Sequence, residues 1–463
     1  MPPAAPVPPG APRERLLRLP VLAWSAWDWG SAAFNAVVTT FVFTVWITGD
    51  SFVEPGAAAE VTNALHSTWL GWGMAGAGVV VALLAPALGA LADASGRRKP
   101  WLAWNTLVVV VAMAGMVLID PAVGGRDRAV VIGITLLAVG TVFFELASVA
   151  YNALLLHITT PRGIGRVSGL GWGMGYVGGI VLLLILYFGF INPAVGLFGV
   201  TDQGGRDIRA SLAVATIWMG LFALPVLFWV RERVDQPRSV GFAGTYRKLG
   251  RDVAVLWRTR RSTLWFLISS AIFRDGLTGV FTFGAVLAQG TFGFGPDEVI
   301  VFAIAANLVA GFFTIAAGWL DDRFGPRRVI IVSLAVLVAA ATAVFVLHDG
   351  GKTVFWVAAL VLSACVGPAQ SASRGLLGRL TDPGKETEAY GLYATTGRAA
   401  SFLAPASFGL AITWFGHGEE QYWGILGITF VLALGLVTFL FVRFPGGLGV
   451  DGARDTIPAQ VQG

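Results

Sequence analysis

The sequence predicts an all-α integral membrane protein with twelve transmembrane helices in two pseudo-symmetric six-helix bundles. Of the 463 residues, 56% are hydrophobic and 13% are charged, and the mean hydropathy is +0.72. This is more apolar surface than a soluble domain of this size buries. Apolar runs of roughly 20 residues, each able to span ~30 Å of hydrocarbon as a helix, recur about twelve times. Charged turns and polar positions of the first half recur in the second, which indicates a duplicated six-helix unit.

The chain divides into five regions on the same pattern. We expect a disordered cytoplasmic N-terminus, an N-terminal six-helix bundle, a basic cytoplasmic linker, a C-terminal six-helix bundle and a disordered C-terminal tail, at 1–20, 21–230, 231–262, 263–443 and 444–463. The expected spans are 21–48, 66–92, 100–119, 128–155, 165–190, 211–230, 263–290, 297–319, 328–347, 353–377, 388–415 and 421–443. A short amphipathic helix on the membrane surface is expected at 246–257, with a solvated tether as the alternative.

The distribution of basic residues predicts the topology. Most of the 32 Lys and Arg fall in the termini and the even-numbered loops, whereas the odd-numbered loops hold only Arg126, Arg128, Arg206, Arg209 and Lys352. The positive-inside bias therefore predicts a multi-pass protein of the cell membrane with both termini cytoplasmic.

The first span carries a polar stripe on an apolar cylinder. Asp28, Ser31 and Asn35 follow one another at helical spacing, so a helix places them on one face. A carboxylate that faces lipid is costly, so this face is expected to line a transport cavity. The seventh span repeats the stripe, with Arg274 beside Asp275.

Two charged turns mark equivalent places in the two halves. The second span ends in GALADASGRRKP and the eighth in GWLDDRFGPRR. A constant offset of 229 residues relates Gly89, Asp93 and Gly96 to their counterparts Gly318, Asp322 and Gly325. We expect these turns to latch the cytoplasmic side by ion pairs and helix-end contacts. The gate residues are expected to be Gly89, Asp93, Gly96, Arg97, Arg98, Asp322, Arg327 and Arg328.

Further polar positions lie in the fourth, tenth and eleventh spans. Glu145 shares a helical face with Asn152. A second constant offset, of 222 residues, relates the fourth and fifth spans to the tenth and eleventh, so Asn152 corresponds to Arg374. Gln370 precedes Arg374 by one turn, and Arg398 lies in the eleventh span. The guanidinium groups are candidates for holding an anionic group, because they offer a fork of donors.

Several sequence blocks resemble the Major Facilitator Superfamily, and within it the vacuole-effluxer-like family named for a fungal autophagy-related permease. The blocks are the two turns, AWDWGSAAF, YNALLLHI, GRVSGLGWGMGYVGG, FRDGL, GPAQSASRGLLGRL and EAYGLYATTGR. The resemblance implies a twelve-helix fold in which the first, fourth, seventh and tenth helices line a central cavity. It also points to amino acids as the leading solute.

These observations together predict a secondary active transporter of a small organic solute, working by alternating access and coupled to a proton or another cation. The substrate and coupling cavity is expected to contain Asp28, Ser31, Asn35, Glu145, Asn152, Arg274, Asp275, Gln370, Arg374 and Arg398. For Asp28, the alternative is a structural acid bonded to an arginine or to a backbone amide. The functional alternatives are efflux of drug-like or lipid-like compounds and a lipid translocase on the same fold.

Other classes of function lack their motifs. All four histidines fall at predicted span ends, there is no H-E-x-x-H motif, and Cys365 is the only cysteine. A membrane enzyme needs a nucleophile and base or metal ligands gathered at one depth, so no enzyme, metal site or cofactor is expected. The expected partners are a small-molecule substrate and the lipid bilayer, without nucleic acid, and the chain is expected to be a monomer.

Overall fold

The computed structural model describes residues 16–232 and 261–442 except 295, 383, 418 and 419, together with isolated residues within 251–258. Nearly all of these residues are helical. The expectations for most of the N-terminus, the linker helix at 246–257 and the C-terminal tail lie outside the described residues.

Six spans form the N-terminal bundle. The first combines α1 (Leu19–Ala32), the π-helical segment η1 (Ala33–Phe41) and α2 (Phe43–Ile47). The others are α3 (Ala59–Ser95), α4 (Lys99–Val117), α5 (Arg126–Ile158), α6 (Ile164–Leu186) with its π-helical extension η3 (Tyr187–Ile191), and α7 (Arg206–Trp229). Short 3-10 turns lie in the loops, and one apolar core is built entirely from this half.

The C-terminal bundle repeats the arrangement. Its spans are α9 (Arg261–Gly290), α10 (Pro296–Phe324), α11 (Pro326–Val346), α12 (Gly351–Leu380), the pair α13 (Glu386–Ala400) and α14 (Leu403–Trp414), and α15 (Trp423–Leu440). Its apolar core also includes residues of α3 and α5, where the two bundles pack.

The eleventh span differs from the continuous helix expected at 388–415. It breaks at Ser401 and Phe402, and the Ser401 hydroxyl donates to the Arg398 carbonyl at 2.8 Å. Such local bonds compete with the helical ladder. Eleven helical segments of the described chain are long and apolar enough to cross a membrane, and the broken pair α13–α14 supplies the twelfth span. The predicted twelve-helix fold is therefore confirmed.

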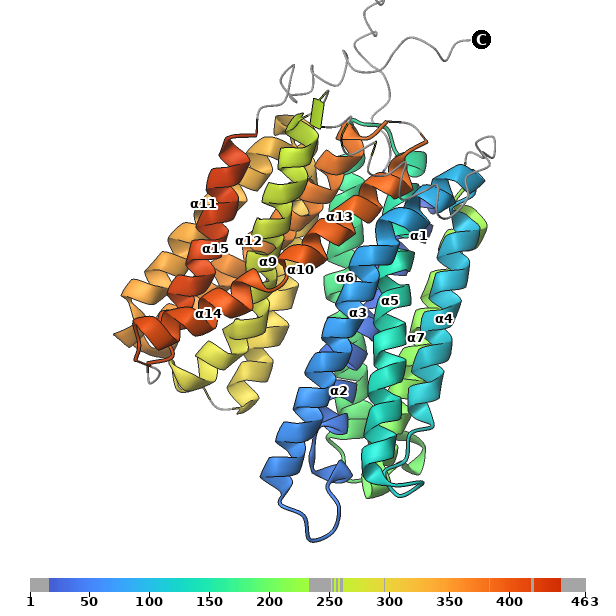
Figure 1. Ribbon diagram of the computed structural model, residues 1–463, viewed down its shortest axis with the longest axis vertical. Coiled ribbons are helices and arrows are strands. Elements are labelled where there is room, and N and C mark those ends of the chain that lie inside the picture. The colour runs from blue at the N-terminus through green and yellow to red at the C-terminus, as the bar shows by residue number, and fades with distance from the viewer. Residues whose placement is uncertain are drawn as a thin grey trace, which may run out of the picture.

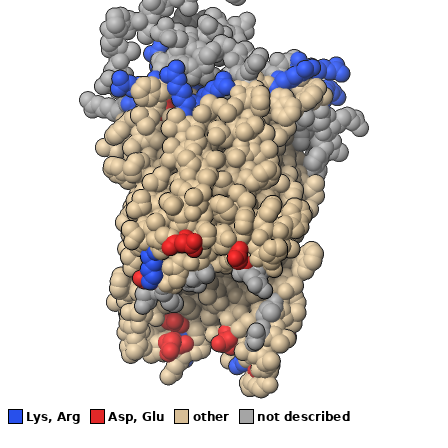
Figure 2. Space-filling view, turned by 90° about the vertical axis from the view of Figure 1, so that its left-hand side faces the viewer, with Lys and Arg blue, Asp and Glu red and all other residues tan. Residues whose placement is uncertain are grey.

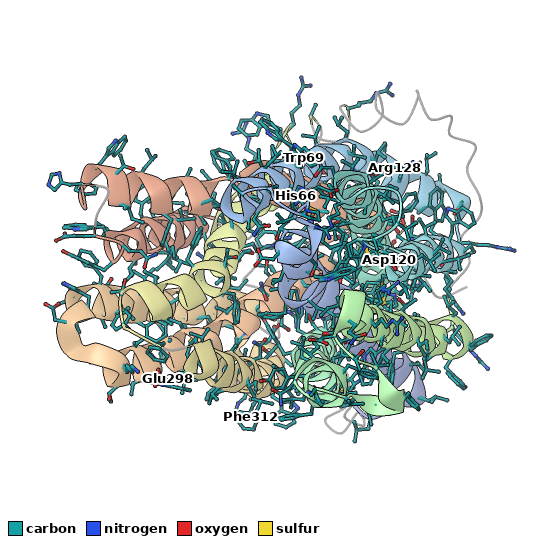
Figure 3. All side chains as sticks on the ribbon, turned by 90° about the horizontal axis from the view of Figure 1, so that it is seen from below. His66, Trp69, Asp120, Arg128, Glu298 and Phe312 are labelled. Carbon is teal, nitrogen blue, oxygen red and sulfur yellow. The ribbon has the colours of Figure 1, made fainter. Side chains whose placement is uncertain are left out.

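The two bundles stand side by side (Figure 1). We call the end that holds both charged turns the motif end. The beginning of α1 and the end of α15 lie at this end (Figure 1), and on the face drawn in Figure 2 most Lys and Arg gather there, whereas Asp and Glu lie toward the opposite end. Seen from that opposite end, His66 and Asp120 belong to one bundle and Glu298 to the other (Figure 3).

Candidate functional site

An ion pair between Asp28 of α1 and Arg374 of α12 joins the two bundles. Nη1 of Arg374 lies 3.3 Å from Oδ2 of Asp28, and the two side chains are 5% and 16% exposed. The Tyr151 hydroxyl donates to the same carboxylate oxygen at 2.9 Å. Asp28 therefore holds one bond within its own bundle and one ion pair to the other.

Stacked aromatic rings position this carboxylate. The Tyr151 ring lies between the rings of Trp24 and Trp27, at centroid distances of 4.4 and 4.3 Å. Nε1 of Trp24 donates to the Tyr151 carbonyl at 3.0 Å, and Nε1 of Trp27 donates to the Thr106 hydroxyl at 3.2 Å. Both tryptophans are buried. Trp24 lies one helical turn before Asp28 and so shares its face. A rigid wall of the N-terminal bundle thus presents the Asp28 side chain.

The Arg374 guanidinium is bound mainly by the opposite bundle. Nε donates to the Ser168 hydroxyl at 2.9 Å, Nη2 to the Ser168 carbonyl at 2.7 Å, and Nη1 to Oδ1 of Asn152 at 3.2 Å. Its central carbon lies 4.9 Å from the centroid of Trp24. If the bundles part at this point, Arg374 loses these acceptors and needs new ones.

A second ion pair also crosses between the bundles. Nη2 of Arg398 on α13 contacts Oε1 of Glu145 on α5. The two side chains are 31% and 26% exposed, so this pair is more accessible than the pair of Asp28 and Arg374.

Arg274 and Asp275 are adjacent in the sequence but have separate partners. Nη1 of Arg274 donates to the Tyr393 carbonyl at 3.0 Å, and its guanidinium lies 3.7 Å from the centroid of the Tyr393 ring. The buried Asp275 carboxylate instead accepts the backbone N–H of Ala404, at the beginning of α14. Asp275 therefore caps the helix that follows the break in the eleventh span.

This cap predicts a loss of stability in Asp275→Ala. Removing a capping side chain costs about 1 kcal/mol of folding free energy, and more where the N–H is buried. We expect Asp275→Ala to denature at a lower temperature than the wild type in detergent, and Asp275→Asn to stay close to it, because asparagine caps as well as aspartate. Asp349→Ala, at a 95% exposed side chain of the same bundle, is the control. Equal melting of Asp275→Ala and the wild type would contradict the capping role.

The remaining predicted cavity residues lie on both sides of the bundle interface. Oε1 of Gln370 accepts the Tyr176 hydroxyl across the interface at 2.9 Å. The buried Ser31 donates to the Asp28 carbonyl at 2.9 Å, which directs its hydroxyl along its own helix. The Asn35 side chain is exposed. The structure thus brings Asp28, Asn152 and Arg374 into direct contact and pairs Glu145 with Arg398, whereas Ser31, Asn35 and Asp275 lie apart from these contacts.

At the motif end, Asp93 binds the first turn of a helix in the opposite bundle. Its carboxylate accepts the backbone N–H groups of Thr387 and Glu388 on α13, at 3.2 and 2.8 Å. Arg98, which is fully buried, pairs with Asp93 at 2.9 Å and with Glu386 at 2.6 Å. Glu386 is the first residue of α13.

Asp322 makes the equivalent contact in the reverse direction. It accepts the backbone N–H groups of Gly165 and Arg166 on α6, at 2.8 and 3.2 Å. Gly165 and Arg166 correspond to Thr387 and Glu388 by the same offset that relates Asn152 to Arg374 in the sequence. Each half therefore caps a helix of the other with its motif aspartate, and the positive helix end favours the negative charge.

Part of the expected gate is arranged differently from the prediction. Asp322 pairs with Arg166 at 2.7 Å and with Arg379 at 3.2 Å. Arg97 and Arg328 are exposed, and Arg327 donates to the Leu440 carbonyl at 3.1 Å. The ion pairs expected of Arg327 and Arg328 are therefore made by Arg166 of α6 and Arg379 of α12, because these two helices contact the turn that follows α10.

Glycines allow the gate to close tightly. A Cβ atom at Gly89 would lie 2.5 Å from the Thr387 carbonyl oxygen, and one at Gly165 would lie 2.7 Å from the Asp321 side chain. Gly96 has φ 67° and ends α3 in the left-handed conformation. These glycines are therefore required by close approach or by backbone conformation.

Sequence reasoning missed four charged members of the gate: Arg166, Asp321, Arg379 and Glu386. Asp321 pairs with Arg379 at 2.7 Å. The sequence held a partial signal for the place of Arg166. The offset of 222 residues makes its helix equivalent to α13, and the offset of 229 makes Asp93 equivalent to Asp322. The two offsets show that the contact of Asp93 with α13 and the contact of Asp322 with α6 are equivalent, whereas the contacts themselves are seen only in the structure.

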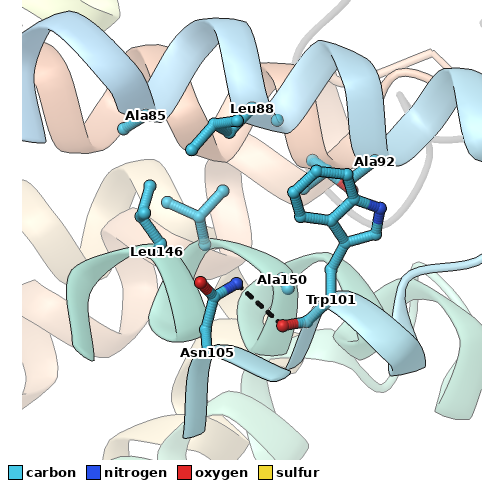
Figure 4. Close-up of a pocket in the computed structure, with 10 residues that line it drawn as sticks. Ala85, Leu88, Ala92, Trp101, Asn105, Leu146 and Ala150 are labelled. Carbon is cyan, nitrogen blue, oxygen red and sulfur yellow. Dashed lines mark hydrogen bonds between the residues drawn. The ribbon is translucent and has the colours of Figure 1, made fainter. Parts of the chain in front are cut away.

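A small pocket lies beside the gate, between α3, α4 and α5 (Figure 4). Its walls are mostly apolar, with Leu88, Trp101 and Leu146 among them, and Asn105 donates to the Trp101 carbonyl at 2.7 Å (Figure 4). Neither Asp28 nor Glu145 lines it. It is a packing gap behind the docked α13, separate from the two ion pairs.

Comparison with known families and sequences gives a consistent result. A family model described as "Vacuole effluxer Atg22 like" matches residues 159–447. An uncharacterized MFS-type transporter of Bacillus subtilis, YxiO, is 24% identical over 440 residues, which cover 94% of this chain and 97% of that protein. Autophagy-related protein 22-1 of Neosartorya fischeri is 25% identical over 337 residues, which cover 65% of this chain and 52% of that protein. The aligned part is thus about half the length of the fungal relative.

Solved structures share the fold. The proton:xylose symporter XylE superposes with a TM-score of 0.69 at 14% identity, covering 92% of this chain and 94% of that one. The human organic anion transporter MFSD10 gives a TM-score of 0.69 at 14% identity, covering 93% and 100%. The Escherichia coli fucose:proton symporter FucP gives 0.68 at 12% identity, covering 93% and 100%.

Proposed function

Because the chain belongs to the vacuole effluxer Atg22-like family of major facilitator superfamily transporters, we propose that it moves a small zwitterionic solute, with amino acids as the leading class. Transport is by alternating access and is coupled to the movement of protons. The observation that carries this proposal is the ion pair between Asp28 and Arg374, since it joins the two bundles inside the membrane span.

The pair explains how a proton drives the change of conformation. Each partner comes from a different bundle, so opening at this level separates a carboxylate from a guanidinium in a medium of low dielectric. A proton on Asp28 removes one of these charges, so less charge has to be separated when the bundles part at this level. XylE and FucP, two proteins with the same fold, are named proton symporters.

The contacts between the bundles support an assignment of the conformational state. The hydrogen bonds and ion pairs between the bundles that are named above lie between the motif end and the middle of the spans. We propose that the motif end is cytoplasmic, in the cell membrane, and that the protein is outward-facing. The basic side chains at that end support this orientation (Figure 2).

The proposal is tested by transport in proteoliposomes that contain the purified protein as a monomer. With a gradient of one pH unit, coupling to one proton supports an accumulation of about tenfold, because one unit corresponds to about 1.4 kcal/mol. We expect labelled amino acids to accumulate and a protonophore to abolish the accumulation. The direction of the gradient that drives accumulation distinguishes uptake from efflux. Movement of labelled lipid without solute transport would support a lipid translocase instead.

A further inference from the structure

The two ion pairs between the bundles have the same polarity. The carboxylates Asp28 and Glu145 belong to the N-terminal bundle, and the guanidinium groups Arg374 and Arg398 belong to the C-terminal bundle. The interface inside the membrane is therefore lined by acids on one wall and by arginines on the other. A solute that enters between the walls meets opposite charges on its two sides.

The pair of Glu145 and Arg398 lies closer to the open end than the pair of Asp28 and Arg374. The motif-end terminus of α5 is Ile158, and that of α1 is Leu19, so the depth of each carboxylate can be counted along its own helix. With a helical rise of about 1.5 Å per residue, Glu145 and Asp28 lie roughly 20 and 14 Å from the motif end. A solute arriving from the opposite end thus meets the more exposed pair first.

Arg274 adds a second cation to the arginine wall beside Arg398. A Cβ atom on Gly397, the neighbour of Arg398, would lie 3.0 Å from Nη2 of Arg274. Because Gly397 has no side chain, the Arg274 guanidinium approaches the α13 backbone closely. Its contacts are the Tyr393 carbonyl and ring, which leave its charge without a carboxylate of the described chain in contact. The arginine wall therefore attracts an anion more strongly than Arg398 alone would.

We propose that Glu145 and Arg398 are the recognition pair for a zwitterion, with Glu145 receiving the ammonium group and Arg398 the carboxylate. This assignment rests on the proposed function and adds the orientation of the solute. When the bundles part, each residue loses its ionic partner, and a zwitterion replaces both partners at once. A plain amine leaves Arg398 unpaired and a plain carboxylic acid leaves Glu145 unpaired. A site built in this way binds both analogues more weakly, because each of them leaves one partly desolvated charge without its ionic partner.

The test measures binding by intrinsic tryptophan fluorescence of the purified full-length protein. The twenty protein amino acids are screened first, and the tightest binder is then compared with its decarboxylated amine and its deaminated acid. We expect each analogue to bind at least tenfold more weakly than the amino acid. In Glu145→Gln, the ratio of the affinity for the amino acid to that for the deaminated acid should fall at least tenfold. In Arg398→Gln, the ratio of the affinity for the amino acid to that for the decarboxylated amine should fall by the same factor.

Two kinds of control accompany these variants. Asp120 and Arg209 form a 3.0 Å ion pair within one bundle, and their side chains are 28% and 23% exposed, similar to those of Glu145 and Arg398. Asp120→Asn and Arg209→Gln should therefore leave the preferences for the amino acid over the acid and over the amine unchanged. The exchanged variant Glu145→Arg with Arg398→Glu keeps a pair at the interface if a single variant does not fold. It should bind the amino acid at least tenfold more tightly than Glu145→Arg alone.

The outcomes separate this assignment from the proposed function. If gradient-driven transport of an amino acid persists and the preferences do not respond to Glu145→Gln and Arg398→Gln, the recognition pair is refuted and the transport proposal stands. If the amine or the acid binds as tightly as the amino acid, the pair is likewise refuted. If no amino acid is bound or transported, the zwitterionic class fails and the recognition pair fails with it.

Discussion

In Asp28→Asn, a gradient of one pH unit is expected to produce no accumulation of solute, whereas the wild type accumulates it about tenfold for one coupled proton. Asparagine still accepts the hydrogen bonds that Tyr151 and Arg374 donate to Asp28. It cannot take up a proton, so the link between the proton gradient and the conformational change is lost. Exchange of labelled for unlabelled solute should persist at least in part, because exchange requires no net movement of protons.

The measurement uses the same proteoliposomes for both assays. Asp120→Asn is the matched control, because it removes a carboxylate charge from an ion pair that lies within one bundle. This control should accumulate and exchange solute as the wild type does. Normal accumulation together with normal exchange in Asp28→Asn would exclude Asp28 as the coupling site.

The second large effect is expected at the gate, in Asp322→Asn. The Asp322 carboxylate accepts two backbone N–H groups of α6 and pairs with Arg166 and Arg379. Removing one partner of a buried ion pair costs about 3 kcal/mol. Because these contacts exist only while the motif end is closed, the loss should shift the equilibrium about 100-fold toward the open gate. Asp93→Asn should act in the same direction, since Asp93 makes the equivalent contacts with α13.

Cysteine labelling reports this shift. The single cysteine, Cys365, is replaced by alanine, and Ala85→Cys provides a reporter. Ala85 is fully buried where α3 meets Gly391 of α13, so a maleimide reaches it only when the gate opens. Labelling from the motif side should be much faster in Asp322→Asn than in the background protein, and Asp120→Asn should not change it. An unchanged rate in Asp322→Asn would show that this carboxylate does not hold the gate closed.

The broken eleventh span illustrates where reasoning from the sequence stopped. The sequence analysis predicted one helix over 388–415, although Pro405 follows the break at Ser401 and Phe402 by three residues and is a signal for an interrupted helix. The break is accompanied by a cap from Asp275, a residue of the seventh span. A pattern within one segment cannot reveal a bond supplied by a helix that is distant along the chain.

The sequence by itself determined the class, the number of spans, the duplication and the positions of most intramembrane charges. These follow from composition, from the length of apolar runs and from fixed offsets, which are properties of the chain. Only the tertiary structure decided the partners: Asp28 with Arg374, Glu145 with Arg398, and each motif aspartate with a helix of the opposite bundle. Spacing fixes which face of its own helix a residue occupies. Which two faces meet depends on how twelve helices pack, and in this fold the contacts on which the proposed mechanism depends lie between the bundles.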